Sequence, residues 1–202
     1  MILAKSKIFR IKKGDTNKVS PFLYLLLLYF FCMSSSLLGQ TTFQLSEISF
    51  GYPIVQEQLP ENYAYDPLFL TARFPIFNKK KRPLSFYAEP QFVLTTPPEE
   101  FRTAFEVGIN LGIQYSFWET EKRKWAIALG VGPHYLSLET SLQHRGFLFS
   151  DNVELAYYQL LSERIGVQLK TRFRHLSNAN LQQPNLGIDN LFVMIGVFWK
   201  TN

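Results

Sequence analysis

The sequence is poor in cysteine and in long apolar runs: it has one cysteine, and no long apolar run follows residue 40. A single cysteine, Cys32, cannot form a disulfide framework within the chain. A helix that crosses a bilayer needs about 20 consecutive apolar residues, and no stretch after Gln40 provides them. Backbone hydrogen bonding and side-chain packing must therefore hold residues 40–202 together.

The sequence also lacks an excess of positive charge outside its first part. The formal net charge is +5, but six of the 21 Lys and Arg residues and one of the 16 Asp and Glu residues precede Gln40. The remainder carries 15 of each and is formally neutral. A nucleic-acid partner would require a basic surface on the folded part, so the composition argues against one.

Metal-binding patterns are absent as well. The chain has three histidines, and two of them, His134 and His144, are isolated from each other and from other ligand types. Structural and catalytic metal sites need several ligands at short, recurrent spacings. We therefore expect no metal and no cofactor.

The first 39 residues have the organisation of a secretory signal peptide. A basic start is followed by an apolar run from Phe22 to Met33 and then by small residues up to Gly39. A membrane anchor is the alternative, but the uninterrupted run is shorter than a spanning helix requires. We expect residues 1–39 to be removed on export and residues 40–202 to form one domain.

Alternation with period two dominates residues 40–202. In the clearest stretch, one row is almost wholly apolar: Phe101, Thr103, Phe105, Val107, Ile109, Leu111, Ile113, Tyr115 and Phe117. The residues between them are polar or small, which is typical of a β-strand with two different faces. Aromatic residues make up 16% of the chain, and charged residues stand in mid-strand on the polar rows, as they do inside membrane barrels.

Eight such stretches can be counted: Thr41–Phe50, Pro67–Phe77, Leu84–Thr95, Phe101–Trp118, Trp125–Ser137, Phe147–Leu160, Ile165–Asn178 and Ile188–Lys200. Short charged connections alternate with longer ones, as periplasmic turns alternate with extracellular loops. The sequence therefore predicts an all-β fold, an eight-stranded antiparallel transmembrane β-barrel with both termini periplasmic. Closure would leave no unpaired strand edge in the bilayer.

Charged residues on the predicted strands fall into two groups. Lys170, Arg172 and Arg174 share the polar row and are expected to pair inside the barrel with acids such as Glu106 and Glu154. Two other acids, Glu47 and Asp151, fall on apolar rows, Glu47 with Phe43 and Leu45, and Asp151 with Val153, Leu155 and Tyr157. We expect both to lie near the membrane interface.

A possible catalytic set lies near the end of the sequence. His175 and Ser177 are two residues apart, so in a strand both point to the same face. A serine hydroxyl becomes nucleophilic when an imidazole takes its proton, and a third group commonly orients the imidazole. Asp189 begins the next strand at the same predicted height and is the candidate for that role. In most proteins such a pair is incidental, but here it ends an apolar row, which suggests a lipid substrate.

The residues from 175 to 189 resemble the outer-membrane lipid A 3-O-deacylases of the PagL type. The resemblance lies in His175-Leu176-Ser177-Asn178-Ala179, followed by Pro184-Asn185-Leu186-Gly187-Ile188 and an acid. It implies that His175 is the base, Ser177 the nucleophile and Asp189 the orienting acid, at a position where the family usually has glutamate. It associates Asn178 with the oxyanion region and Asn185 with the active-site loop.

The resemblance further implies hydrolysis of the 3-O-linked acyl chain of lipid A, with release of a 3-hydroxy fatty acid. The expected location is the outer membrane of a Gram-negative bacterium, with the active site facing the outer leaflet. The implied partners are lipopolysaccharide, membrane lipid and, for insertion, the barrel-assembly machinery. The oligomeric state stays open. Two alternatives also remain: a catalytically inactive structural or adhesive barrel, and a lipid A acyltransferase.

Overall fold

The computed structural model describes residues 46–56, 58–59, 63–64, 67–77, 83–95 and 104–200. The expected signal peptide, residues 1–39, lies outside these ranges. Every regular element in the described part is a β-strand. None of these residues forms a helix that could cross a membrane.

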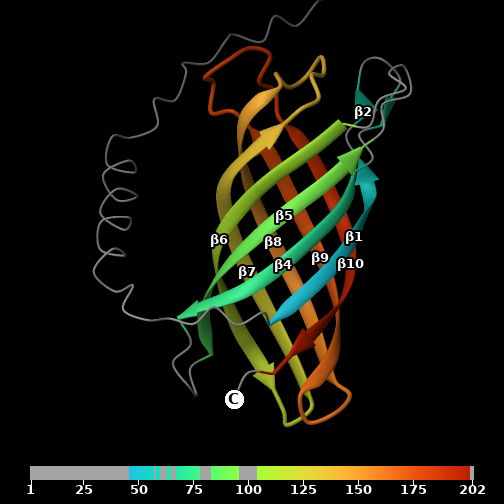
Figure 1. The fold of residues 1–202 in the computed structure, drawn as a ribbon, viewed down its shortest axis with the longest axis vertical. Coiled ribbons are helices and arrows are strands. Elements are labelled where there is room, and N and C mark those ends of the chain that lie inside the picture. The colour runs from blue at the N-terminus through green and yellow to red at the C-terminus, as the bar shows by residue number, and fades with distance from the viewer. Residues whose placement is uncertain are drawn as a thin grey trace, which may run out of the picture. The chain divides into compact units, whose positions relative to one another are not determined.

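Eight strands close into an antiparallel barrel, as the sequence predicts (Figure 1). Two very short strands, β2 and β3, which lie between β1 and β4 in the sequence, form a separate pair. The strands are β1 (Glu47–Gln56), β2 (Gln58–Leu59), β3 (Tyr63–Ala64), β4 (Leu68–Phe77), β5 (Leu84–Thr95), β6 (Ala104–Glu119), β7 (Arg123–Leu136), β8 (Gly146–Leu160), β9 (Ile165–Ser177) and β10 (Ile188–Trp199).

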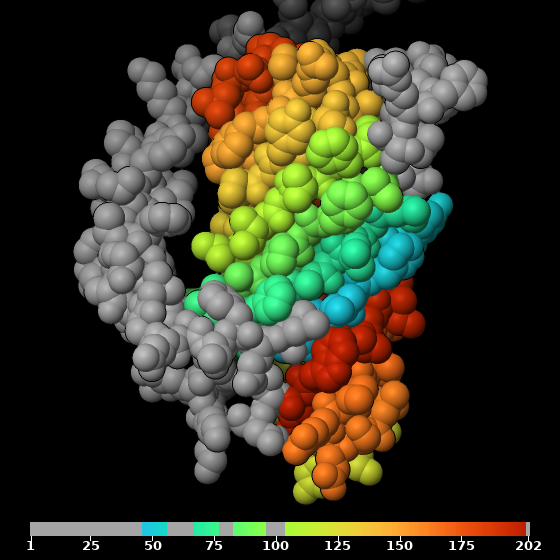
Figure 2. Space-filling view, viewed as in Figure 1, coloured from blue at the N-terminus to red at the C-terminus, as the bar shows by residue number. Residues whose placement is uncertain are grey.

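The barrel closes between its first and last strands. Strand β1 pairs with β10 in a register that places Phe50 opposite Ile195, and on its other side it pairs with β4. Figure 2 shows these strands lying side by side although they come from distant parts of the chain. Closure gives the edges of the sheet hydrogen-bond partners.

The predicted bounds of the first strand are wrong. The strand runs from Glu47 to Gln56 rather than from Thr41 to Phe50, so it extends into the expected loop that starts at Gly51. Glu47 also faces the barrel interior and is 6% exposed, whereas the alternation with Phe43 and Leu45 placed it outside. Residues 41–45 lie outside the described part of the chain. The other seven strands begin and end within three residues of their predicted bounds.

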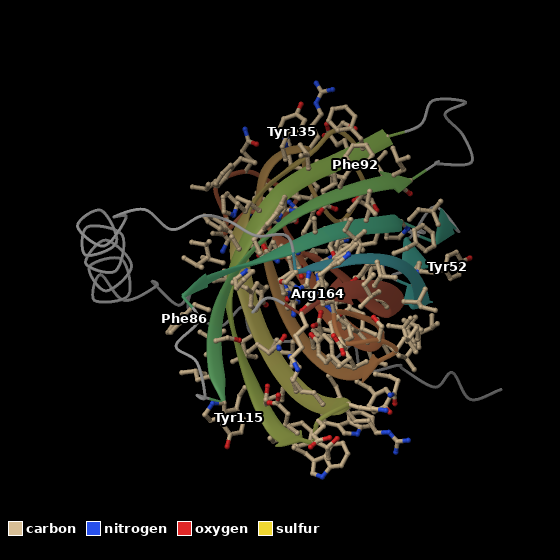
Figure 3. The ribbon with its side chains drawn as sticks, turned by 60° about the horizontal axis from the view of Figure 1, so that its bottom comes forward. Tyr52, Phe86, Phe92, Tyr115, Tyr135 and Arg164 are labelled. Atoms are coloured by element: carbon tan, nitrogen blue, oxygen red, sulfur yellow. The ribbon has the colours of Figure 1, made fainter. Side chains whose placement is uncertain are left out.

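The outer face of the barrel is apolar. Burial alternates along β7, β8 and β9, and the residues that point outward are mainly large hydrophobic side chains. Figure 3 shows Tyr52, Phe92 and Tyr135 among those that project from the strands. A continuous apolar belt around a closed sheet is the surface that a bilayer requires.

The interior holds a dense network of opposite charges. Arg172 donates two hydrogen bonds to Glu89, of 2.7 and 2.9 Å, and also pairs with Glu154. Arg73 binds both acids, and Lys170 lies 3.5 Å from Glu154. This confirms the expectation that the basic row of β9 pairs inside the barrel. Buried charges require such partners, and these cross-links join strands on opposite sides of the barrel.

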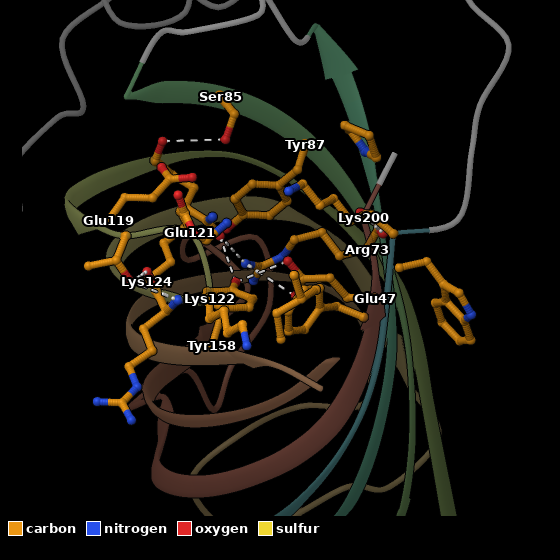
Figure 4. A pocket seen from close by; sticks show the side chains of 18 of the residues that line it. Glu47, Arg73, Ser85, Tyr87, Glu119, Glu121, Lys122, Lys124, Tyr158 and Lys200 are labelled. Atoms are coloured by element: carbon orange, nitrogen blue, oxygen red, sulfur yellow. Dashed lines mark hydrogen bonds and ion pairs between the residues drawn. The ribbon is translucent and has the colours of Figure 1, made fainter. Parts of the chain in front are cut away.

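A cavity of about 260 Å³ opens at the end of the barrel that carries the short turns at residues 120–122 and 161–164 (Figure 4). We call this end the turn end. Glu47, Arg73, Lys124 and Tyr158 are among the residues that line the cavity. It contains none of the predicted site residues.

Candidate active site

The predicted nucleophile and base lie at the last residues of β9, at the opposite end of the barrel from the cavity. His175 and Ser177 alternate with the buried Leu176 and Asn178, so both side chains lie on the outer, membrane-facing side. The connections 137–145 and 178–187 lie at this same end, which we call the loop end. Within the described residues, the Ser177 hydroxyl makes no hydrogen bond, so the structure does not join it to His175, and the Ser177 side chain is half-buried.

His175 and Asp189 are directly opposite each other in the register of β9 and β10. The Nδ1–H group of His175 donates a hydrogen bond of 2.7 Å to Asp189 Oδ1, with the two side chains 36% and 50% exposed. This contact orients the ring and leaves its Nε2 atom for proton transfer on the other side. Asp189 therefore reaches the imidazole although it is one methylene shorter than glutamate.

A second carboxylate, Asp151 of β8, lies on the other side of His175. The β8–β9 register places Asp151 opposite His175 and Phe149 opposite Ser177. Asp151 is exposed on the outer face, and its carboxylate has no hydrogen-bond or ion-pair partner among the described residues. In the sequence, Asp151 is visible only as an acid that interrupts an apolar row. The position of Asp151 beside His175 depends on the register of β8 and β9.

Gly187 packs against the edge of the imidazole. A Cβ atom built on this residue would lie 2.4 Å from His175 Cε1 and 3.1 Å from Nε2. Its φ angle of +87° also favours glycine. The motif contained this residue, but its contact with His175 becomes evident only in the folded chain.

Asparagines stabilise the loop that follows Ser177. The backbone N–H of Asn178 donates a 2.7 Å hydrogen bond to Asn185 Oδ1, and its side-chain Nδ2 donates to the Gln182 carbonyl at 2.8 Å. Asn185 Nδ2 donates in turn to Asn180 Oδ1 at 3.1 Å. The two predicted loop residues thus come together, and both hold the shape of the segment between nucleophile and acid.

The neighbouring loop, residues 137–145, supports this segment from the side. The backbone N–H of His144 donates to the Pro184 carbonyl, and that of Leu186 donates to the Leu142 carbonyl, both at 2.8 Å. Gln143 is buried, and its backbone forms an isolated antiparallel β-bridge with that of Asn185. The sequence did not reveal this docking because the two loops are about 40 residues apart.

The histidines other than His175 do not form a metal site. His134 is buried inside the barrel, where its Nδ1 atom hydrogen-bonds Glu106 at 2.6 Å. Arg174 binds the same carboxylate at 2.8 Å. In the described part of the chain, no three potential metal-ligating side chains lie together.

The sequence matches the model of the family described as "Lipid A 3-O-deacylase (PagL)" over residues 63–198. The chain belongs to this family. The match covers most of the barrel and includes every candidate site residue. No curated protein sequence matches the chain.

Two solved structures share the fold of this deacylase family member. The crystal structure of the outer membrane enzyme PagL matches with a TM-score of 0.60 and 17% identity, over 75% of this chain and 98% of that one. The crystal structure of Neisserial surface protein A (NspA) matches with a TM-score of 0.52 and 10% identity, over 77% of this chain and 94% of that one. At these identities the likeness shows the fold alone. Family and fold together identify an outer-membrane barrel.

Proposed function

We propose that the chain is an esterase that removes the 3-O-linked acyl chain of lipid A. The observation that carries the proposal is the 2.7 Å contact between His175 and Asp189, with Ser177 on the same outer face two residues away. Family membership supplies the substrate class. Residues 1–39 are proposed to be the export signal.

The height of Ser177 on the barrel supports a substrate in the outer leaflet. From Ile165, at the turn end of β9, ten residues lead to His175. Ten strand residues, at about 3.3 Å each and a tilt of about 40°, rise roughly 25 Å, the usual height of the apolar belt. The site would therefore lie where the sugar of lipid A meets its acyl chains, at the level of the ester, with the loop end facing outward.

The mechanism follows from the roles of the three side chains. Ser177 Oγ attacks the ester carbonyl while His175 Nε2 takes its proton, and Asp189 stabilises the resulting imidazolium. His175 then protonates the departing sugar oxygen as the ester C–O bond breaks. A water molecule, deprotonated by His175, attacks the acyl-enzyme, and the fatty acid leaves as Ser177 regains its proton.

The oxyanion of each step needs hydrogen-bond donors, each worth about 3 kcal/mol. Asn178 or the backbone N–H groups of the following turn are the candidates. The Nδ2 group of Asn178 already donates to Gln182. Among residues 178–187, all described, the N–H groups of Ala179 and Asn180 donate no hydrogen bond, and both residues are exposed. Unlike Asn178 Nδ2, these two N–H groups are free to donate to an oxyanion and follow Ser177 closely in the chain.

Mass spectrometry of lipid A from cells that express the chain tests the proposal. Wild type should remove one 3-hydroxyacyl chain, and Ser177→Ala should reduce the rate at least about 10³-fold. Ser162→Ala, which changes an exposed serine at the turn end, should behave as wild type.

Two alternatives predict other products. An acyltransferase would remove one acyl chain from lipid A and pass it to another acceptor, without releasing free fatty acid. A structural barrel would leave lipid A intact in cells and in detergent although the protein is folded in the membrane, and this result would refute the esterase.

A further inference from the structure

We propose that Asp151 is a substrate-binding residue that accepts a hydrogen bond from the hydroxyl group at carbon 3 of the acyl chain. The inference rests on the proposed function and adds a determinant of acyl-chain specificity. Asp151 lies directly opposite His175, on the side of the ring away from Asp189.

An unpaired carboxylate on this surface requires an explanation. Asp151 is exposed on the outer face, and the residues two positions before and after it, Phe149 and Val153, are apolar. A charge on the lipid-facing side of a barrel is costly within the apolar belt and cheaper near the interface. Among the described residues nothing donates to the carboxylate of Asp151, so its two oxygen atoms remain available to accept hydrogen bonds from a bound molecule.

The position of Asp151 fits one donor of the substrate. Directly opposite residues in an antiparallel pair have Cβ atoms about 4.5–5.5 Å apart, so Asp151 lies beside the imidazole. It lies one row below Ser177 toward the membrane, and the acyl chain runs in that direction from the ester carbonyl. The hydroxyl at carbon 3 is two carbons below that carbonyl, at the level of the Asp151–His175 row.

The β8 side of the site is the open side. On the β10 side, Asp189 already binds His175, and Gly187 packs against the ring. On the β8 side, a surface hollow of about 540 Å³ lies at the loop end, lined in part by Tyr135, Phe147 and Leu181, and Asp151, His175 and Ser177 are not among its lining residues. A substrate on Ser177 would therefore lie over β8, where Asp151 is the acidic side chain opposite the base.

The proposal predicts discrimination between two substrates. The test uses two synthetic lipid A molecules that differ only in their 3-O chain, 3-hydroxytetradecanoyl or tetradecanoyl. In detergent micelles, wild type should hydrolyse the hydroxylated ester with a kcat/KM about ten- to a hundredfold higher, the usual effect of a hydrogen bond to a charged group. Asp151→Ala should bring this ratio close to one by slowing the hydroxylated substrate, and Asp151→Asn should give an intermediate ratio.

Controls separate this role from general damage. Glu163→Gln removes an exposed charge at the turn end and should keep the wild-type ratio. The difference in electrophoretic mobility between the folded and the unfolded barrel verifies that each variant is folded. If Asp151→Ala slows both substrates equally, Asp151 acts through His175 and the specificity role is refuted. An unchanged ratio with unchanged rates also refutes it. If wild type hydrolyses neither substrate, the proposed function itself fails, and this inference fails with it.

Discussion

His175 and Asp189 are joined by a hydrogen bond of 2.7 Å although they come from different strands, β9 and β10. The two residues are direct cross-strand partners, so the backbone register itself brings the carboxylate to the ring. The aspartate needs no change in strand position to reach Nδ1. The shorter side chain is therefore compatible with an orienting role.

Removal of the Asp189 charge should impair catalysis without unfolding the barrel. Asp189→Asn retains the shape but no longer stabilises the imidazolium or the correct tautomer, and a loss of about 10³- to 10⁴-fold in kcat is expected. Asp189→Glu should retain most of the activity. Steady-state hydrolysis of lipid A in micelles measures both variants, and equal activity of Asp189→Asn and wild type would exclude the orienting role.

Gly187→Ala should displace the imidazole, because the new methyl group would lie 2.4 Å from Cε1. A misplacement of about 1 Å can cost about 100-fold in rate, and kcat should therefore fall by roughly that factor. Gly146→Ala is the control for backbone strain, since Gly146 also has a positive φ, +109°, but nothing lies within 4 Å of its added Cβ. Gly146 lines the loop-end hollow, so the comparison uses kcat and not KM. Both variants carry similar backbone strain, so an equal loss of activity in the two would contradict the proposed contact.

The interior network should make Glu89 important for stability. Glu89 accepts hydrogen bonds from Arg73 at 2.8 Å and from Arg172 at 2.7 and 2.9 Å, and it is fully buried. Glu89→Gln leaves the two guanidinium groups short of one negative charge, which should lower the free energy of unfolding by about 3–5 kcal/mol.

Urea unfolding of the refolded barrel in lipid vesicles measures this effect. The exposed Glu163, changed to Gln, should shift the free energy of unfolding by less than about 0.5 kcal/mol. A Glu89→Gln variant as stable as the Glu163→Gln control would show that the remaining carboxylates compensate fully.

Most of the barrel could be predicted from alternation because a bilayer imposes one rule on every strand. Apolar residues face the lipid and polar or small residues face inward, so period two reports both the strand and its faces. The first strand shows the limit of this rule. A period-two pattern keeps both faces when the strand slides by an even number of residues, so the pattern does not say where the strand begins. The pairing with β10, in which Phe50 lies opposite Ile195, decides where β1 begins.

The orientation of Glu47 shows the same limit. Its inward position depends on an ion pair with Lys170, which lies 123 residues further along the chain. No local pattern contains that information, and the apolar neighbours upstream indicated the opposite face.

The sequence by itself determined the class of fold and the three side chains of the candidate site, because these follow from periodicity and from a short contiguous motif. Only the tertiary structure decided which other residues surround His175. Asp151 reaches it from β8 and Gly187 from the loop before β10, and the pairing of the strands brings them together. Register depends on hydrogen bonds between neighbouring strands, and the residue preferences within one strand do not specify it.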